Sequence, residues 1–152
     1  MRKVKLKIYC DTNIYSRPFD QILNSRIHLE AMACLKIFNL AYNNKIYLTS
    51  SDILKFEILN ASPEKQLLIG PLLKLCQKHI KQTNTIKDLA LLINKDANLA
   101  PRDSLHLASA IIGKINFFIT CDQKILRKNK NHLFNSIIIL NPIELIYQYE
   151  NQ

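Results

Sequence analysis

Short apolar runs recur along the chain, and the first of them alternates with basic residues. Strands bury either alternate side chains or all of them, so such runs are typical of β-structure. They predict strands at residues 4–9, 46–49, 117–120 and 137–140, with a further short candidate at 80–83.

Between these runs, apolar residues are spaced three and four positions apart, as on the buried face of an amphipathic helix. Proline and small polar residues mark several helix starts, because proline fits the first turn and a polar side chain can cap it. The expected helices cover residues 22–43, a segment that starts near Ile53, 63–79 with an interruption at Gly70-Pro71, 86–96, 101–113 and 142–149. Residues 124–132 have the most loop-like composition.

Strands therefore alternate with helices along the whole chain. Parallel strands need helical crossovers, so this order predicts an α/β fold, a three-layer α/β/α sandwich around a four- to five-stranded parallel sheet. No linker, repeat or low-complexity segment divides the sequence. A chain of 152 residues with 48% hydrophobic content suits a single domain that spans residues 1–152.

The chain is strongly basic. Lys and Arg total 21 against 12 Asp and Glu, which gives a formal net charge of +9. This excess suggests nucleic acid or an acidic membrane face as a partner, and a solvated lysine-rich surface is the alternative. The only glycines are Gly70 and Gly113, which excludes a glycine-rich phosphate loop.

The four cysteines form no Cys-x-x-Cys pair, so they indicate reduced core residues rather than a zinc or redox motif. The N-terminus lacks the apolar run of a signal peptide, and no apolar run approaches the length of a membrane span. We therefore expect a soluble, cytoplasmic protein that does not associate with membranes.

Four acidic residues occupy comparable places relative to the predicted strands and helices. Asp11 and Asp122 each follow a strand directly. Glu57 lies in the helix after the second strand, and Asp103 lies in the first turn of a later helix. Ligands of an open parallel sheet bind beyond the carboxyl ends of its strands, so we expect these four side chains to converge there.

Converging carboxylates require a positive charge nearby, since two unit charges about 4 Å apart repel by roughly 4 kcal/mol at an effective dielectric near 20. A divalent cation removes this repulsion. Oxygen-only ligation suits Mg²⁺ or Mn²⁺, and the absence of a His or Cys ligand cluster argues against zinc. Such a cation can activate water and neutralise the charge that grows on a phosphoryl oxygen.

Each acid also has a structural alternative. Asp103 suits the macrodipole of its helix, Asp122 can cap the following helix, and Glu57 can simply face solvent. The run Asp11-Thr12-Asn13 can form a turn that satisfies its own backbone groups. It is the ordered set of four acids that favours a shared site.

Four short motifs occur in a characteristic order. They are Asp11-Thr12-Asn13, Ser51 with Glu57, Asp103-Ser-Leu-His106-Leu-Ala-Ser-Ala110, and Thr120-Cys-Asp122. In this order and approximate spacing they resemble a PIN domain, and in particular the VapC-type toxin branch of that superfamily. The resemblance extends from Val4 to about Leu140, but no further acid follows Asp122 closely, where some PIN nucleases carry one.

This resemblance implies a compact α/β/α fold whose acidic pocket holds Mg²⁺ or Mn²⁺ and hydrolyses RNA phosphodiester bonds. The residues that correspond to the catalytic and metal-binding quartet are Asp11, Glu57, Asp103 and Asp122. Asn13 and Thr120 correspond to polar supports around it. The resemblance also implies a homodimer, and an antitoxin protein as the inhibitory partner in a type II toxin–antitoxin pair.

Three basic residues near the expected ligands are candidates for contacts with RNA. Arg17 and Arg102 can each hold a phosphate, with a structural role as the alternative. His106, one turn beyond Asp103, can reach a phosphate or orient the carboxylate, or it can simply pack its helix. Cys10 and Cys121 precede their aspartates by one residue, so strand alternation should turn them into the core.

The sequence therefore predicts a metal-dependent endoribonuclease in which Asp11 and Asp103 hold the main cation, while Glu57 and Asp122 complete the site. The first alternative is a non-catalytic RNA-binding or protein-interaction module on the same fold, which predicts binding that is insensitive to chelator. The second is a metal-dependent phosphatase, which predicts activity on a phosphomonoester.

Overall fold

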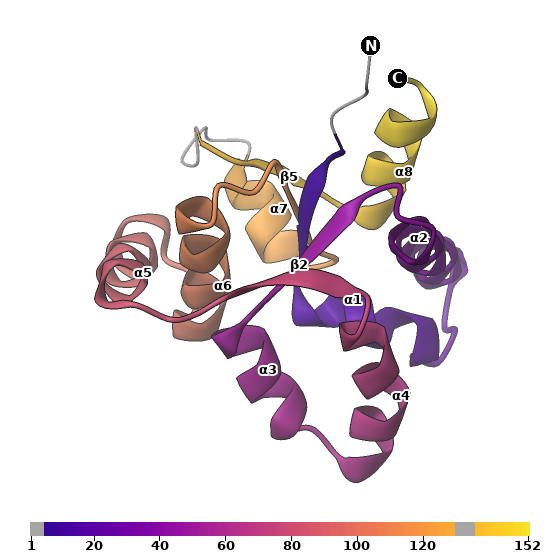
Figure 1. Ribbon diagram of the computed structural model, residues 1–152, viewed down its shortest axis with the longest axis horizontal. Coiled ribbons are helices and arrows are strands. Elements are labelled where there is room, and N and C mark those ends of the chain that lie inside the picture. The colour runs from indigo at the N-terminus through magenta and orange to yellow at the C-terminus, as the bar shows by residue number, and fades with distance from the viewer. Residues whose placement is uncertain (1–4, 130–135) are drawn as a thin grey trace.

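The computed structural model describes residues 5–129 and 136–152, which form a five-stranded sheet with helices on both faces (Figure 1). The strands are β1 (Lys7–Cys10), β2 (Tyr47–Ser51), β3 (Cys76–Ile80), β4 (Phe117–Ile119) and β5 (Ile138–Leu140). All neighbouring strands are parallel, in the order β3-β2-β1-β4-β5. The α/β sandwich with a parallel sheet that was expected from the sequence is confirmed.

Helices connect the strands. They are α1 (Thr12–Ser16), the 3-10 helix η1 (Arg17–Phe19), α2 (Ser25–Tyr42), α3 (Asp52–Leu59), α4 (Pro63–Leu73), α5 (Asn84–Ala97), α6 (Pro101–Ile112), α7 (Gln123–Asn129) and α8 (Pro142–Glu150). Several begin at a proline, and several are capped by a side-chain oxygen that accepts a backbone N–H of the first turn, as Ser51 does for α3. In the described ranges, no helix combines the length and the apolar content that crossing a bilayer would require.

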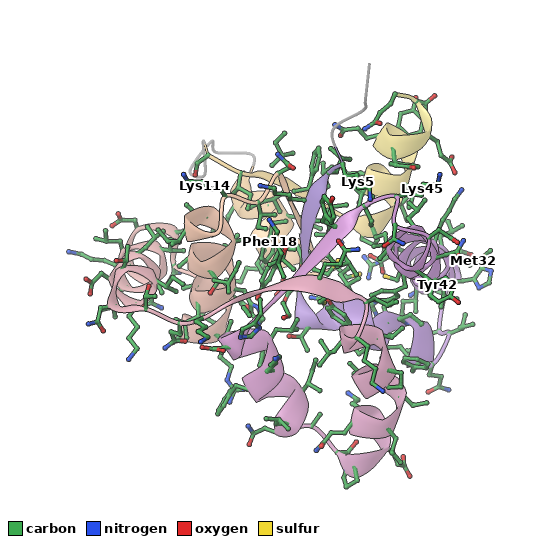
Figure 2. The ribbon with its side chains drawn as sticks, viewed as in Figure 1. Lys5, Met32, Tyr42, Lys45, Lys114 and Phe118 are labelled. Carbon is green, nitrogen blue, oxygen red and sulfur yellow. The ribbon has the colours of Figure 1, made fainter. Side chains whose placement is uncertain are left out.

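Strand alternation divides the buried side chains between two hydrophobic cores. In β1, Ile8 and Cys10 pack into the core beneath α2 and α8, whereas Tyr9 packs into the core beneath α5 and α6. Phe118 of β4 lies on the Tyr9 side, near the centre of the molecule (Figure 2). Right-handed crossovers explain this arrangement, because connections that run in opposite directions along a parallel sheet place their helices on opposite faces.

The direction of the connections reverses at β1. The chain passes from β1 to β2 and β3 on one side, and then crosses to β4 and β5 on the other. The backbone N–H of Asp11 donates to the carbonyl of Ile119 over 2.9 Å, so the ends of β1 and β4 meet directly. This reversal point, at the carboxyl edge of the sheet, is where an open parallel sheet binds its ligands.

The predicted short strand and the helix before it are misplaced in the sequence-based prediction. β3 begins at Cys76 rather than at residue 80, and α4 ends at Leu73 rather than near residue 79. The residues after α4 form a parallel ladder with β2, in which Ser50 lies beside His79. Backbone hydrogen bonds at the open edge of β2 therefore override the local apolar spacing.

Much of the segment expected to be a loop is helical, since α7 covers Gln123–Asn129. Ile125 is fully buried in the core beneath α5 and α6, and this anchor explains why a Lys- and Asn-rich segment folds as a helix. Residues 130–132 of the predicted loop, and residue 4 of the first predicted strand, lie outside the described residues.

The four cysteines are free thiols, as expected. Cys10 and Cys121 both pack into the core beneath α2 and α8, with Cys34 of α2 beside them. Strand alternation therefore turns these thiols away from Tyr9 and towards the opposite face of the sheet.

Candidate metal centre

Asp11 lies where β1 ends, and it is buried with 5% of its surface exposed. It caps helix α1: one carboxylate oxygen, Oδ1, accepts the backbone N–H of Thr12 over 2.8 Å. The other, Oδ2, accepts the hydroxyl of Thr120 over 2.8 Å and the amide of Asn13 over 3.2 Å. Both oxygens of this carboxylate are therefore oriented by protein donors at the reversal point of the sheet.

Asn13 and Thr120 form the support around this carboxylate. The Asn13 amide nitrogen also donates to the Thr120 hydroxyl oxygen over 3.1 Å, and the Asn13 side-chain oxygen accepts the backbone N–H of Cys121 over 2.9 Å. Thr120 follows β4, while Asn13 belongs to α1. Together they hold the loops after β1 and β4 against each other.

Glu57 reaches the same place from α3. Its Oε1 accepts the hydroxyl of Thr12 over 2.8 Å and is hydrogen bonded to Nε2 of His106. Its Oε2 lies 4.0 Å from the Arg102 guanidinium, and the side chain is 20% exposed. The structure therefore brings Glu57 and Asp11 together, with Thr12 bonded to both.

His106 lies beneath these two carboxylates and is almost fully buried, with 1% of its surface exposed. Its Nε2 is hydrogen bonded to Glu57 and lies 3.7 Å from Oδ1 of Asp11. In the described residues, Asp11, Glu57 and His106 form a group whose potential ligand atoms all lie within 4.8 Å of one another. A histidine therefore joins the two carboxylates, and of the alternatives considered for His106 these contacts favour a residue that orients a carboxylate.

Asp103 lies in the first turn of α6 and is partly buried. Burial and the negative charges of Asp11 and Asp122 raise its pKa to about 6, although His106 opposes that rise. None of the lysines or arginines that the structure describes lies within ion-pair distance of it. Asp103 thus carries a charge that the surrounding protein does not neutralise.

Asp122 follows β4 and has a contact of its own. Its Oδ1 accepts the backbone N–H of Lys124 over 2.8 Å, as an N-cap of α7, and its backbone N–H donates to the Thr120 hydroxyl over 3.0 Å. Neither Asp103 nor Asp122 belongs to the compact group around His106 in the described part of the chain. Their charges nevertheless act on one another, as the raised pKa of Asp103 indicates.

The two carboxylates that face His106 differ in their protonation equilibria. Burial raises the pKa of the Asp11 carboxyl, although the charge of His106 and the Thr120 hydroxyl oppose that rise. Burial also acts to raise the pKa of Glu57, but the hydrogen bond and charge of His106, the Thr12 hydroxyl and the charge of Arg102 together outweigh this effect, and the pKa is lowered. For His106, burial acts to lower the pKa, but the hydrogen bond to Glu57 and the negative charges of Asp11, Glu57 and Asp103 together outweigh it, and the pKa is raised.

A protonated His106 supplies one positive charge to four carboxylates, so the cluster keeps a net negative charge. Carboxylate oxygens are the ligands that Mg²⁺ and Mn²⁺ prefer. The oriented carboxylate of Asp11, and the charge of Asp103 that Asp11 and Asp122 disfavour, fit such a cation. The residues present therefore suit the metal that the sequence implied, although part of the repulsion is relieved by a histidine.

Arg17 and Arg102, both considered for RNA contacts, lie in different surroundings. Arg17 forms an ion pair with Asp20 over 3.0 Å and lies 3.6 Å from the carboxylate of Glu30, which is buried. These contacts favour its structural alternative. Arg102 has a 60% exposed side chain beside Glu57 and over the ring of Phe56, so it remains free to contact a substrate.

Three residues of the site had no role assigned from the sequence, although Thr12 and Ser51 belong to the motifs named there. Thr12 bridges Asp11 and Glu57, while Tyr9 and Ser51 contact each other on the far side of His106. The position of Thr12 between Asp11 and Asn13 was the available signal. Tyr9 resembles an ordinary core residue in its strand, and its polar role follows only from which side chains pack above it.

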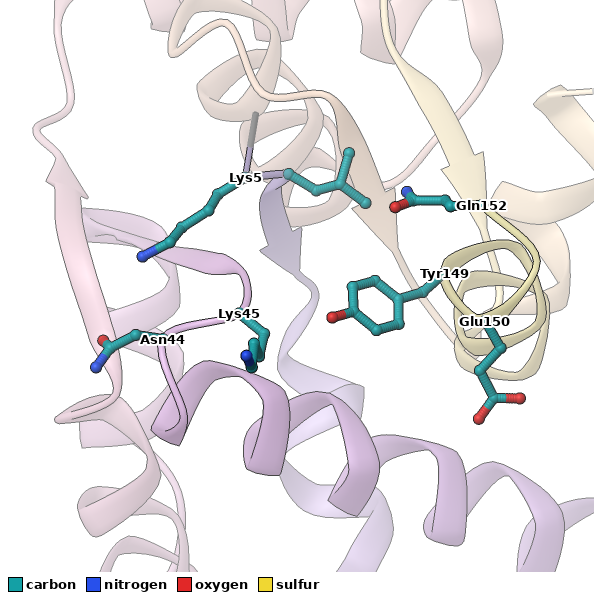
Figure 3. Close-up of a pocket in the computed structure, with 7 residues that line it drawn as sticks. Lys5, Asn44, Lys45, Tyr149, Glu150 and Gln152 are labelled. Atoms are coloured by element: carbon teal, nitrogen blue, oxygen red, sulfur yellow. The ribbon is translucent and has the colours of Figure 1, made fainter. Parts of the chain in front are cut away.

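A pocket of about 490 Å³ lies at the opposite end of the sheet, before β1 and β2 begin (Figure 3). It is lined by Lys5, Leu6, Asn44, Lys45, Tyr149, Glu150 and Gln152. Glu150 is paired with Lys36 at its rim. None of the acidic residues near His106 lines this pocket, so it is separate from the candidate metal centre.

Comparison with known proteins supports the architecture. The chain is similar to the crystal structure of FitAcB from Neisseria gonorrhoeae, with a TM-score of 0.55 and 19% identity, over 89% of this chain and 97% of that one. At this identity the likeness concerns the fold, and it agrees with the α/β/α sandwich around a parallel sheet that was expected from the sequence. No protein-family model and no curated protein matches the sequence.

Proposed function

We propose that this chain is a metal-dependent endoribonuclease that hydrolyses RNA phosphodiester bonds. The observation that carries the proposal is the compact group of Asp11, Glu57 and His106 at the carboxyl edge of the parallel sheet, whose negative charges, with that of Asp122, also raise the pKa of Asp103. Acidic sites of this kind bind divalent cations, and a bound divalent cation can promote the hydrolysis of a phosphodiester bond.

In this proposal, Asp11 and Asp103 hold the main cation, and Glu57 and Asp122 complete the site directly or through water. The cation, Mg²⁺ or Mn²⁺, would activate a water molecule and neutralise charge on the phosphoryl oxygens. Asn13 and Thr120 keep the Asp11 carboxylate oriented, so that its oxygens need no rearrangement when the cation binds.

RNA is the proposed substrate because the rest of the surface is basic. With four of the 12 acids in the site, eight remain against 21 Lys and Arg. This excess attracts a phosphate backbone, while the cation prevents the acidic pocket from repelling it. Arg102 is the residue best placed to hold a phosphate, since it is exposed and lies next to Glu57.

We further propose that the chain is the toxin of a type II toxin–antitoxin pair that acts in the cytoplasm, with an antitoxin protein as its inhibitor and a homodimer as its working form. This part rests on the motif order that resembles VapC-type PIN domains. Purification of the chain together with the product of its neighbouring reading frame tests it. A stable complex that loses nuclease activity supports the pairing, and two proteins that elute separately contradict it.

The direct test is cleavage of single-stranded RNA by purified protein with Mn²⁺ or Mg²⁺, repeated with a chelator. We expect Asp11→Asn to abolish cleavage, and we expect Asp88→Asn to retain it as a matched control, because Asp88 is an exposed aspartate on α5. Cleavage that survives both the chelator and Asp11→Asn would overturn the proposal. A phosphomonoester, assayed in parallel, separates a nuclease from a phosphatase.

A non-catalytic RNA-binding or protein-interaction module is the second candidate, and one observation favours it. His106 already neutralises part of the charge on Asp11 and Glu57, so the fold does not depend on a metal ion to the extent that the acids alone suggest. This candidate predicts RNA binding that is unchanged by chelator and by Asp103→Asn, with no cleavage under any metal condition.

A further inference from the structure

A chain of buried hydrogen-bonding groups runs from β2 through β1 to the candidate metal centre. The hydroxyl of Tyr9 lies 2.6 Å from Oγ of Ser51 on one side and 2.6 Å from Nδ1 of His106 on the other. Nε2 of His106 then meets Oε1 of Glu57. Tyr9 and Ser51 have no exposed surface, so no solvent competes for these contacts.

The surroundings of His106 Nε2 determine what that nitrogen does. It faces Oε1 of Glu57, Oδ1 of Asp11 at 3.7 Å, and the Thr12 hydroxyl at 3.4 Å. The Thr12 hydroxyl donates its hydrogen to Oε1 of Glu57, over 2.8 Å. Each of these three groups is thus a hydrogen-bond acceptor towards Nε2. An unprotonated Nε2 would place its lone pair next to the lone pairs of these acceptors, which is unfavourable.

The other ring nitrogen is satisfied in either protonation state. If Nδ1 is unprotonated, it accepts the Tyr9 hydroxyl, and Tyr9 in turn accepts from Ser51. If Nδ1 carries a hydrogen, it donates to the Tyr9 oxygen, and the Tyr9 hydroxyl donates to Ser51. Ser51 also accepts the backbone N–H of Leu54 over 3.1 Å, which holds its side chain in place. In both cases Nε2 keeps its hydrogen.

We infer that His106 is a positioning residue that donates Nε2–H to Glu57 and is not a ligand of the cation, and that Tyr9 and Ser51 hold its ring in that role. Oε1 of Glu57 is then occupied by Thr12 and His106, which leaves Oε2, 4.0 Å from the Arg102 guanidinium, as the oxygen available to a cation. The inference rests on the proposed nuclease function for the cation, but the donor assignment can be tested without any metal.

The test is ¹H–¹⁵N NMR of the imidazole nitrogens in the full chain. A variant with His28, His79 and His132 replaced by Gln leaves the signal of His106 alone, and its spectrum is recorded without metal and then during a Mg²⁺ titration. We expect the shift of a protonated nitrogen at Nε2 in both states. An unprotonated Nε2 in the metal-free protein, or loss of its hydrogen when Mg²⁺ binds, would overturn the inference.

Two hydroxyl deletions separate positioning from general stability. Tyr9→Phe removes the hydrogen bond with Nδ1 of His106 and keeps the ring that contacts the imidazole and stacks on Phe118. Tyr15→Phe is the matched control, because Tyr15 is equally buried and its hydroxyl contacts Cys76, at 3.3 Å, in the core on the other face of the sheet. We expect Tyr9→Phe to shift the Nδ1 signal of His106 and Tyr15→Phe to leave it unchanged, and equal spectra would contradict the role of Tyr9.

Rescue by a conservative variant completes the test. The side-chain amide of His106→Gln can still donate to Glu57, whereas His106→Leu cannot. For a positioning residue we expect RNA cleavage to fall roughly tenfold to a hundredfold in His106→Leu and to recover in part in His106→Gln. Equal loss in both variants would contradict positioning through a donated hydrogen. Absence of cleavage in the wild-type chain would instead count against the proposed function, and the NMR result would still decide the donor assignment.

Discussion

The side-chain oxygen of Asn13 accepts the backbone N–H of Cys121 over 2.9 Å, which ties the segment after β1 to the segment after β4. The amide nitrogen of the same residue donates to Asp11 and to Thr120. One side chain therefore holds together the two strand ends between which the sheet reverses direction. The position of Asp11 depends on this contact as much as on its own strand.

Replacement of Asn13 tests that dependence. Asn13→Ala leaves the backbone N–H of Cys121 without its acceptor, and we expect a loss of roughly 1–3 kcal/mol in the free energy of unfolding. Asn13→Asp keeps the acceptor but places a second carboxylate close to Asp11. We expect this repulsion to lower the free energy of unfolding, and Mg²⁺ to restore part of it. Urea unfolding with and without Mg²⁺ measures both, and an Asn13→Ala variant as stable as wild type would contradict this role.

Asp103 should be unfavourable for stability in the absence of metal. Its pKa in the folded protein, about 6, lies above the ordinary value of 3.8, so ionisation destabilises the fold as pH rises through about 6. Asp103→Asn removes that charge, and we expect the metal-free protein to gain on the order of 1 kcal/mol at pH 7.5, after allowance for partial exposure. Thermal unfolding with chelator checks this.

The same variant should lose cation binding, so stability and function are expected to change in opposite directions. Asp88→Asn, an exposed aspartate with the same change of charge, serves as the control and should alter neither quantity appreciably. If Asp103→Asn destabilised the metal-free protein, the carboxylate would have a favourable partner and the description of its charge as uncompensated would be wrong.

Cation affinity should depend on pH through Asp103. A cation binds the ionised carboxylate, so protons compete below a pKa of about 6, and the affinity for Mn²⁺ should fall by about tenfold per pH unit there. Above pH 7 the carboxylate is ionised and the affinity should be nearly constant. Calorimetric titration from pH 5 to pH 8 measures this profile. An affinity that is constant across the whole range would exclude Asp103 as a ligand.

The two arginines should separate into a structural residue and a substrate contact. Arg17→Ala leaves the buried carboxylate of Glu30 without a cation, and we expect a loss of roughly 2–4 kcal/mol in the free energy of unfolding. Arg102→Ala should leave stability nearly unchanged but weaken RNA binding. The slope of log affinity against log salt concentration should fall by the amount that corresponds to about one phosphate contact. Denaturant unfolding and RNA titrations at several salt concentrations distinguish the two.

The fold could be predicted largely from the sequence because the buried elements carry clear patterns. β4 is apolar over its whole length and β1 is apolar and buried after Lys7, and Pro101 and Pro142 mark helix starts that the structure has at those residues. β3 had no such pattern, since its three central residues are exposed and only its pairing with β2 makes it a strand. An edge strand of this kind is specified by its neighbour and not by its own side chains.

The residues of the site that directly follow a strand could be predicted from the sequence. The residues whose position depends on the packing of one helix against another could not. Asp11 and Asp122 follow β1 and β4, which sequence order alone indicates. The contact of His106 with Glu57 joins α6 to α3, and no spacing within either helix specifies it. A histidine three residues after Asp103 has the spacing of an ordinary packing residue, and only its surroundings show the acceptors that it faces.

The central claim is that folding gathers distant carboxylates into one site for a divalent cation. The most direct measurement is an anomalous difference map from crystals of the chain grown with Mn²⁺. We predict a manganese peak within coordination distance of the carboxylates of Asp11 and Asp103. A map with no peak at those two residues, at a Mn²⁺ concentration that supports RNA cleavage, would contradict the claim.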